Sequence, residues 1–288
     1  DSCASPIVNA LEYIRNGNAQ VIVTDKAFRE NYAKISVQLV TPDESVTVPY
    51  YLVKSDDSWL MVSSFSVYTK DWKKYETRYV NVYCNDGTLV NEFALEKLNE
   101  FIELMGEHLL LSQSKMKLLE KEKINYYLCN EDEIEEITGF PTHGMTNLQF
   151  DAIVSRHLPH YHEVVHLLVN YALNPLPLFT LPCLQEGTAV CFGGRWGKSP
   201  QVIFQIGYFT LAQQFFKLED ILTYNGFHQI VGNPDFSYPI SGIFVRFLIE
   251  KFGIEKLKLL YRRLSGNDKA VQNFSLDYVQ SKIAEVCG

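Results

Sequence analysis

Two histidines and a glutamate stand at a metal-binding spacing in the segment His162-Glu163-Val164-Val165-His166. Histidines four positions apart project from one face of a helix, so both rings can bind a single Zn²⁺. Glu163 points one position round from the first histidine, where its carboxylate can reach a water molecule on the open side of the metal. The motif therefore predicts hydrolytic chemistry with a metal-activated water.

The neighbours of this motif bear on whether its polar side chains need a metal. The alternative to a metal site is that both histidines are ordinary polar groups of a helix, with partners elsewhere in the protein. The surrounding residues are almost wholly apolar, so the helix should be buried and its polar groups should need partners; these neighbours are Val164, Val165, Leu167, Leu168 and Val169. A metal ion would supply such a partner.

A zinc site of this kind needs a third protein ligand and keeps a fourth position for water. Nineteen residues lie between His166 and Glu186, enough for the end of one helix, a loop and the start of a second helix. Pro175 and Pro177 end the first helix, and Pro182 lies near the start of the second. We therefore expect Glu186 in the first or second turn of a new apolar helix, with its carboxylate facing the histidines.

The segment that contains Glu186 is Leu-Gln-Glu-Gly-Thr-Ala-Val, residues 184–190. His-Glu-Val-Val-His followed by this segment resembles the gluzincin metallopeptidases, zinc proteases that take two histidines and a glutamate from a separate helix as ligands. The similarity is closest to the peptidase MA-like branch, with thermolysin-like and membrane-alanyl-aminopeptidase-like folds, of an exported bacterial type. Residues 237–248 are similar to the Tyr-x-x-x-Gly helix opening of that branch. The resemblance covers roughly residues 75–288.

Carried over residue by residue, the resemblance implies that His162, His166 and Glu186 are the ligands of one Zn²⁺ per chain. Glu163 would be the general base and Tyr238 the group that stabilises the oxyanion. Zinc lowers the pKa of a bound water to about 7, and Glu163 would accept its proton and later pass it to the leaving amine. The alternative for Tyr238 is a core aromatic residue, because the chain contains 17 tyrosines.

The chain departs from the exopeptidases of this branch, which hold the substrate's amino terminus with a Gly-x-Met-x-Asn anchor. The nearest match, Gly144-Met145-Thr146-Asn147, is one residue short and closer to the histidines than usual. The departure leaves endopeptidase and aminopeptidase action both open. We expect Gln149 to Ser155 to form an edge strand next to the metal, where an extended peptide could pair with the backbone.

Three further polar residues lie near the motif. His160 and His162 diverge on a helix because they are two positions apart, so a second shared metal site is not expected. We interpret His157 and His160 as surface groups or as groups that support the ligands. Asn170 lies one turn beyond His166 and is expected to be exposed, the alternative being that it holds a ligand ring.

Composition and charge exclude some classes of function. The 288 residues are 47% hydrophobic, enough for a large core and for two domains or subdomains. A net charge of −8 and the lack of a basic stripe argue against nucleic-acid binding. No apolar run approaches the roughly 18 residues of a membrane span. The expected partner is a peptide or protein substrate, and the sequence leaves the oligomeric state open.

The chain begins Asp1-Ser2-Cys3, without a methionine or a signal peptide, so we expect a secreted, periplasmic or cell-surface protein whose leader has been removed. Its six cysteines are compatible with disulfides but too scattered to dictate them. Cys183 and Cys191 would lie about 12 Å apart on one helix by helical rise and could not bridge.

The order of predicted elements indicates an α+β fold. After a helix at about residues 5–16, strands at 34–41, 45–54 and 58–66 form a small antiparallel meander. Beyond residue 78 we expect a mixed sheet packed on helices, from elements at Tyr79 to Cys84, Phe93 to Leu111, Ile124 to Cys129, and a short helix capped by Asn130 and ended by Gly139. Helices then follow at 158–173, 183–194, 201–216, 239–252, 255–264 and 276–286.

These elements divide into a β-rich accessory domain at residues 1–74 and a catalytic domain at 75–288, in which a mixed-sheet subdomain precedes a helical one. Residues 51–60 faintly resemble the sheet of cystatin-like or nuclear-transport-factor-like domains, which could dock a partner or cover part of the catalytic core. The sequence favours a zinc metallopeptidase. The alternative is a noncatalytic exported binding or structural protein that keeps the gluzincin fold and the metal-binding site.

Overall fold

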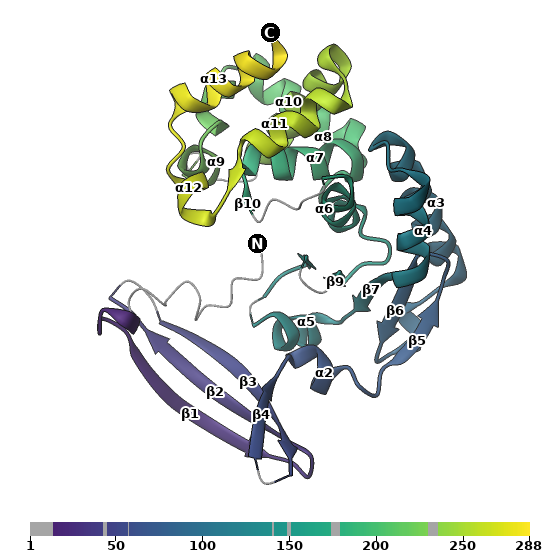
Figure 1. Ribbon diagram of the computed structural model, residues 1–288, viewed down its shortest axis with the longest axis vertical. Helices are drawn as coiled ribbons and strands as arrows, with labels where there is room; N and C mark the ends of the chain where they lie inside the picture. The colour runs from purple at the N-terminus through teal and green to yellow at the C-terminus, as the bar shows by residue number, and fades with distance from the viewer. Residues whose placement is uncertain are drawn as a thin grey trace. The chain divides into compact units, whose positions relative to one another are not determined.

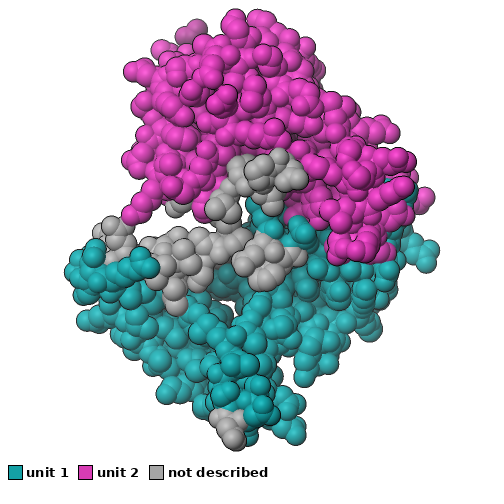
Figure 2. All heavy atoms as spheres, viewed as in Figure 1, with its two compact units in different colours: residues 1–95, 124–158 teal, residues 96–123, 159–288 magenta. Residues whose placement is uncertain are grey.

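The computed structural model describes residues 14–42, 45–56, 58–139, 141–148, 151–173, 179–229 and 236–288. It confirms the α+β prediction, with an antiparallel four-stranded sheet first and a mixed sheet followed by helices (Figure 1). The chain forms two compact units, coloured in Figure 2: unit 1 is residues 1–95 with 124–158, and unit 2 is residues 96–123 with 159–288. The predicted division into 1–74 and 75–288 stays a prediction.

The N-terminal sheet has the order β1-β2-β3-β4 with every pair antiparallel, and comprises β1 (Gln20–Phe28), β2 (Tyr32–Val40), β3 (Ser45–Ser55) and β4 (Ser58–Val62). The three predicted strands are confirmed as β2 to β4. The sequence analysis missed β1 because this edge strand is exposed along nearly its whole length and so lacks a buried alternate face. Of the helix expected at 5–16, residues 1–13 lie outside the described part; residues 14 and 15 are helical.

The third predicted strand ends earlier than expected. The hydroxyl of Ser63 accepts a hydrogen bond from the backbone N–H of Phe65 and so caps a short helix, α2 (Ser64–Tyr68). Since Ser, Thr, Asp and Asn are the preferred residues at this capping position, Ser63 is the signal that separates strand from helix here. The strand expected at 58–66 therefore stops at Val62.

A cluster of three polar side chains joins a helix to two strands within unit 1. Tyr51 of β3 and Lys34 of β2 are paired in register, and both contact the carboxylate of Glu136 in α5 (Glu131–Thr138). The Tyr51 hydroxyl donates a hydrogen bond to Glu136, and Lys34 forms an ion pair with it. Because Tyr51 is only 3% exposed, its hydroxyl needs such an acceptor.

The mixed sheet has the strand order β5-β6-β7-β9-β8, in which the central three strands are parallel and the outer two antiparallel. Its members are β5 (Lys73–Glu76), β6 (Val80–Cys84), β7 (Ile124–Leu128), β8 (Gly144–Asn147) and β9 (Ala152–Ser155). Helix α5 lies between β7 and β8 in the chain and has the predicted ends: Asn130 and Glu133 form a capping box, and Gly139 closes the helix in the left-handed region.

The prediction of an edge strand at residues 149–155 is wrong. Residues 149 and 150 lie outside the described part, and β9 pairs on one side with β7 and on the other with β8. All four residues of β9 are buried, as expected of an inner strand covered on both faces. In a strand with one solvent-exposed face, buried and exposed residues would alternate. The edge strands of this sheet are β5 and β8, and β8 is the segment that resembles the exopeptidase anchor.

Unit 2 contains the predicted helices. They are α6 (Tyr161–Ala172), α7 (Pro182–Gly193), α8 (Pro200–Ala212), α10 (Ser237–Phe252), α11 (Ile254–Arg263) and α13 (Leu276–Cys287). Helix α3 (Glu92–His108), also predicted, starts in unit 1 and is followed by α4 (Gln113–Glu122). Among the described residues, no helix is long and apolar enough to cross a membrane. Cys183 and Cys191 both lie on α7 and do not bridge each other, as predicted; both are free thiols.

Helix α4 was not among the predicted elements of unit 2, and the other elements that were not predicted there are short. They are α9 (Tyr224–Gln229), α12 (Asp268–Gln272), the two-residue pair β10 (Phe179–Thr180) and β11 (Ser265–Gly266), and the 3-10 turn at Leu218–Ile221. Segments of two to six residues are too brief to show a helical or strand period, which needs a window of about 11 residues.

Helices α7 and α10 approach each other through glycines. A Cβ atom on Gly187 would lie 2.6 Å from the carbonyl oxygen of Ser241, and one on Gly242 would lie 2.4 Å from Cγ1 of Val190. Gly187 cannot carry a side chain without moving one helix, and a side chain at position 242 would require Val190 to move aside. The close contact fixes the part of α7 that begins immediately after Glu186.

Candidate metal centre

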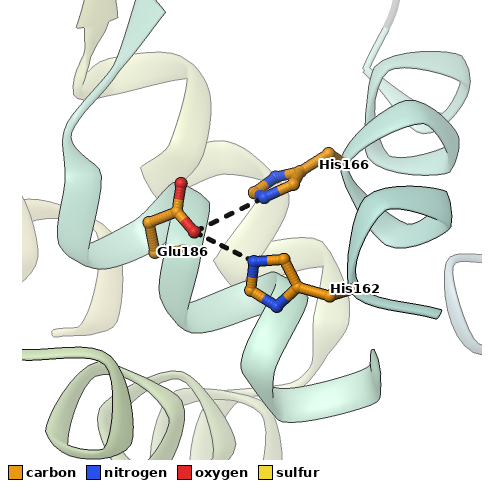
Figure 3. A group of neighbouring side chains, drawn as sticks. All are labelled: His162, His166 and Glu186. Carbon is orange, nitrogen blue, oxygen red and sulfur yellow. Dashed lines mark hydrogen bonds and ion pairs between the residues drawn. The ribbon is translucent and has the colours of Figure 1, made fainter. Parts of the chain in front are cut away.

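His162 and His166 project from α6 toward a common point, as Figure 3 shows. The Nε2 atom of His162 lies 3.1 Å from Oε2 of Glu186, and that of His166 lies 3.4 Å from the same oxygen. One ligand atom from each of the three residues falls within 4.8 Å of the others, a grouping that could hold a metal ion. The spacing of four residues thus has the geometric effect predicted from the sequence.

Glu186 reaches this point from α7, which begins with Pro182 in its first turn as expected. The carboxylate lies one turn into the helix, and its side chain is 21% exposed. The structure therefore brings together the three residues that were predicted as ligands. Two ring nitrogens and one carboxylate oxygen form a donor set that suits a zinc ion.

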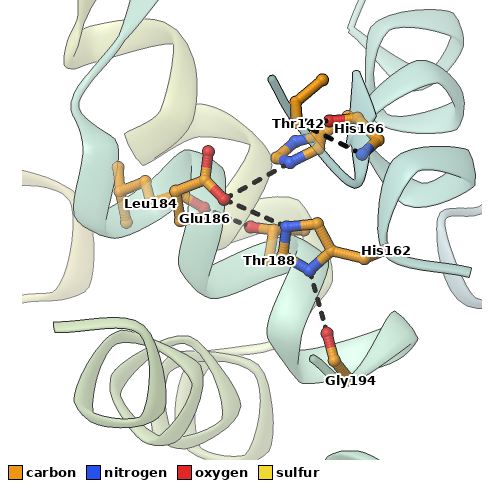
Figure 4. Close-up of polar contacts among 8 residues, drawn as sticks. Thr142, His162, His166, Leu184, Glu186, Thr188 and Gly194 are labelled. Atoms are coloured by element: carbon orange, nitrogen blue, oxygen red, sulfur yellow. Dashed lines mark hydrogen bonds and ion pairs between the residues drawn. The ribbon is translucent and has the colours of Figure 1, made fainter. Parts of the chain in front are cut away.

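The far side of the His162 ring is fixed by the backbone. Its Nδ1 lies 2.9 Å from the carbonyl oxygen of Gly194, directly after α7 (Figure 4). A carbonyl oxygen can only accept, so Nδ1 carries the hydrogen, and in the neutral ring Nε2 is then an acceptor. That acceptor faces an oxygen of Glu186, and two acceptors in contact need a cation or a proton between them. The arrangement fits a metal ion, whose histidine ligands commonly donate their other N–H to a carbonyl.

The electrostatics of the group point the same way. Burial works against a charge on His166, but the carboxylate of Glu186, its hydrogen bond and the nearby Glu163 outweigh this and raise the pKa of His166. Burial also works against the charge on Glu186, yet His166 and His162 hold the pKa of Glu186 well below its usual range. A buried carboxylate that stays ionised favours a positive charge beside it, which a proton on histidine or a metal ion can supply.

Glu163, the predicted general base, is 9% exposed on the buried side of α6. Its carboxylate is near enough to His166 to raise the pKa of that ring. Burial beside the ligands is compatible with the role of a base that acts within a shielded site. Its catalytic role stays a prediction.

Tyr238, the predicted oxyanion stabiliser, lies in the first turn of α10 and is half-buried. Its ring makes an edge contact with Phe227 at a centroid distance of 5.2 Å. The guanidinium carbon of Arg195 lies over the same ring, 3.2 Å from its centroid. Tyr238 thus lies between α9 and the segment that follows α7, and its function stays a prediction.

The structure adds two residues that the sequence analysis missed. Burial lowers the pKa of His228, and the carboxylate of Glu186 partly opposes that shift, so His228 of α9 lies near the third ligand. Burial raises the pKa of Tyr261 in α11; a hydrogen bond with Thr180 works against that rise, and the charge of Glu186 adds to it. No sequence signal marks them, because His228 occupies a six-residue helix and Tyr261 is one tyrosine among many.

The predictions for the other polar residues near the motif, His157, His160 and Asn170, are confirmed only in part. His157 is exposed, and half-buried His160 immediately precedes α6 with its ring centroid 6.5 Å from that of His162. The surface assignment of His157 is therefore confirmed. The expectation that Asn170 is exposed is wrong, because its side chain is only 8% exposed. Helix α6 is buried on nearly every face, so position 170 does not reach solvent.

No protein-family model matches the chain, and a search of curated proteins finds no match either. The gluzincin resemblance therefore stays a prediction from the sequence motifs.

Proposed function

We propose that this protein is a zinc-dependent peptidase that hydrolyses peptide or protein substrates. The observation that supports the proposal most strongly is the convergence of both Nε2 atoms, from His162 and His166, on one oxygen of Glu186. Catalytic zinc sites use three protein ligands of these types and leave a position for water or substrate. The Nδ1 contact of His162 with Gly194 adds the outer support such sites have.

The chain's own residues divide the proton chemistry between them. A zinc ion held by the three ligands would lower the pKa of a water molecule and polarise the substrate carbonyl. Glu163 takes the proton from the water and returns it to the nitrogen of the leaving amine. Tyr238 donates its hydroxyl hydrogen to the oxyanion that develops on the carbonyl oxygen, a contribution of a few kcal/mol in comparable sites.

The proposal is tested by the single substitution Glu163→Gln, which keeps the shape of the side chain but removes its basicity. We expect zinc content near one ion per chain, measured by mass spectrometry of the metal, and a loss of peptide hydrolysis of at least about 100-fold. The matched control is Glu250→Gln, an exposed carboxylate on α10 that pairs with Arg246. This control should retain both the metal and the activity.

Two results would contradict the proposal in different ways. Full hydrolysis by the Glu163→Gln variant would show that another group is the base. A wild-type protein that binds zinc but cleaves no member of a broad fluorescence-quenched peptide library would support the noncatalytic alternative. A chelator that stops hydrolysis, with zinc restoring it, separates this enzyme from a contaminating serine or cysteine peptidase.

A further inference from the structure

The segment that follows α7 folds into a tight turn. Gly194 has φ of +72°, and a Cβ there would lie 2.1 Å from the carbonyl oxygen of Lys198. Trp196 and Gly197 both have positive φ, and Arg195 pairs with Lys198 through hydrogen bonds of 3.2 and 2.8 Å. This is a two-residue hairpin turn of type I′, whose backbone has little freedom.

Consecutive residues of this turn contact two different parts of the proposed active site. The carbonyl oxygen of Gly194 accepts from Nδ1 of the ligand His162. The next residue, Arg195, places its guanidinium over the ring of Tyr238, 3.2 Å from the ring centroid, and lies 5.4 Å from the ring of Trp196. One short turn thus links the position of a metal ligand to that of the predicted oxyanion stabiliser.

The Tyr238 ring has a second aromatic contact. Phe227 of α9 meets it edge to face, and the neighbouring His228 is close enough to Glu186 to feel its charge. Three residues after Tyr238, the carbonyl oxygen of Ser241 leaves no room for a side chain on Gly187, the residue that follows Glu186. The start of α10 is therefore placed against the same helix that supplies the third ligand.

We infer that Arg195 is a positioning residue for Tyr238, an inference that rests on the proposed function. A cation over an aromatic face is attracted by the ring's negative quadrupole and so restrains the ring. The same charge draws electron density from the phenol and makes its hydroxyl a stronger hydrogen-bond donor. Arg195 acts through Tyr238, and its effect appears in the chemical step rather than in substrate binding.

Steady-state kinetics of the zinc-loaded protein test this role. We expect Arg195→Met to lower kcat about tenfold with KM nearly unchanged, and Arg195→Lys to recover part of the loss because an ammonium group also binds an aromatic face. In a Tyr238→Phe background, Arg195→Met should cause no further loss, because the hydroxyl that it positions is gone. The control is Arg246→Met, which removes a guanidinium over another ring, that of Phe204, at 5.1 Å.

A second measurement needs neither metal nor activity. In metal-free protein labelled with 3-fluorotyrosine, the ¹⁹F resonance of Tyr238 is assigned by its absence in Tyr238→Phe. Arg195→Met should shift or broaden this resonance, Arg195→Lys should change it less, and Arg246→Met should leave it in place. Circular dichroism establishes that each metal-free variant is folded; if Arg195→Met does not fold, Arg195→Gln replaces it.

An unchanged Tyr238 resonance in Arg195→Met would overturn the inference, and so would equal kcat values for Arg195→Met and wild type when Tyr238→Phe is impaired. An additive loss in the double variant would overturn it too, because Arg195 would then act independently of Tyr238. If wild type cleaves no peptide, the proposed function fails, and so does the role of Arg195 in the chemical step. The ¹⁹F spectra would then test only whether Arg195 restrains the Tyr238 ring. The two failures are thus distinguishable.

Discussion

Gly193 lies directly against His162: a Cβ atom at position 193 would be 2.6 Å from the backbone nitrogen of His162 and 2.7 Å from its Cα. The end of α7 therefore touches the beginning of α6, and the next residue supplies the carbonyl that accepts from the His162 ring. This contact sets the distance between the two helices that carry His162 and Glu186.

Gly193→Ala should therefore weaken the fold and the metal site together. Overpacking of this kind costs about 1–3 kcal/mol of unfolding free energy, because backbone atoms cannot move aside as the end of a flexible side chain can. Urea unfolding and zinc titration measure the two effects. Gly266→Ala is the control, since its nearest neighbour is a methyl group at 3.5 Å; a loss as large in the control would contradict the packing argument.

Glu186→Gln should weaken zinc binding by at least about 100-fold, because it replaces the only charged ligand with a neutral amide. It also removes the charge that raises the pKa of His166, so this pKa should fall. Competition with a chromophoric chelator measures the zinc affinity, and NMR titration of the histidine rings measures the pKa. Unchanged zinc affinity would exclude Glu186 as a ligand.

The stability difference between zinc-loaded and metal-free protein should increase with pH. The pKa of His166 is raised in the metal-free fold, so this histidine stabilises the fold below its unfolded pKa and loses that contribution as pH rises through its folded pKa. Zinc requires the deprotonated ring and binds better as protons leave. Thermal unfolding with and without chelator between about pH 5.5 and 8.5 measures the difference. A constant difference would contradict the assigned ligand set.

Chelation near neutral pH also separates a catalytic metal from one that braces the fold. Helices α6 and α7 are packed through many buried apolar residues besides the predicted ligands. We therefore expect metal removal to abolish hydrolysis but to lower the melting temperature only modestly. A metal-free protein that is unfolded at room temperature, judged by circular dichroism, would show that the metal is mainly structural.

Tyr51→Phe tests the polar cluster within unit 1. The substitution removes the hydrogen bond to Glu136 but leaves the ion pair with Lys34, so we expect a loss of about 1 kcal/mol, reduced by the partial exposure of the carboxylate. Urea unfolding measures it, with Tyr208→Phe as an exposed control. Equal stability of Tyr51→Phe and wild type would show that water replaces the phenol without cost.

The sequence predicts those parts of the fold that have a regular pattern over many residues. Helices α6, α7 and α10 were recognisable from apolar runs and from Pro182 and Gly253 at their ends. The grouping of the three predicted ligands was foreseeable in part: positions 162 and 166 lie on one face of a helix by geometry alone, and the prolines of the sequence indicated a second helix that carries Glu186. Export and the domain boundary at residue 74 stay predictions.

Tertiary contacts account for most of what the sequence did not show. Strand β9 resembles an edge strand until its two neighbours are known, and Asn170 is buried only because other elements cover α6. The contacts of Gly194 with His162 and of Arg195 with Tyr238 join residues that are 32 and 43 positions apart. A pattern along the chain cannot contain such pairings, because they depend on how helices cross.

The helix that carries Glu186 is in contact through glycine on both flanks, at Gly187 with α10 and at Gly193 with α6. Such a helix cannot retreat to admit a wider ion without opening one of these seams. Calcium binds oxygen at 2.3–2.6 Å and prefers six to eight donors, whereas zinc is satisfied by four at about 2.0–2.2 Å. If the three residues bind a metal as proposed, these two contacts hold α7 at a spacing that favours a small divalent cation over calcium.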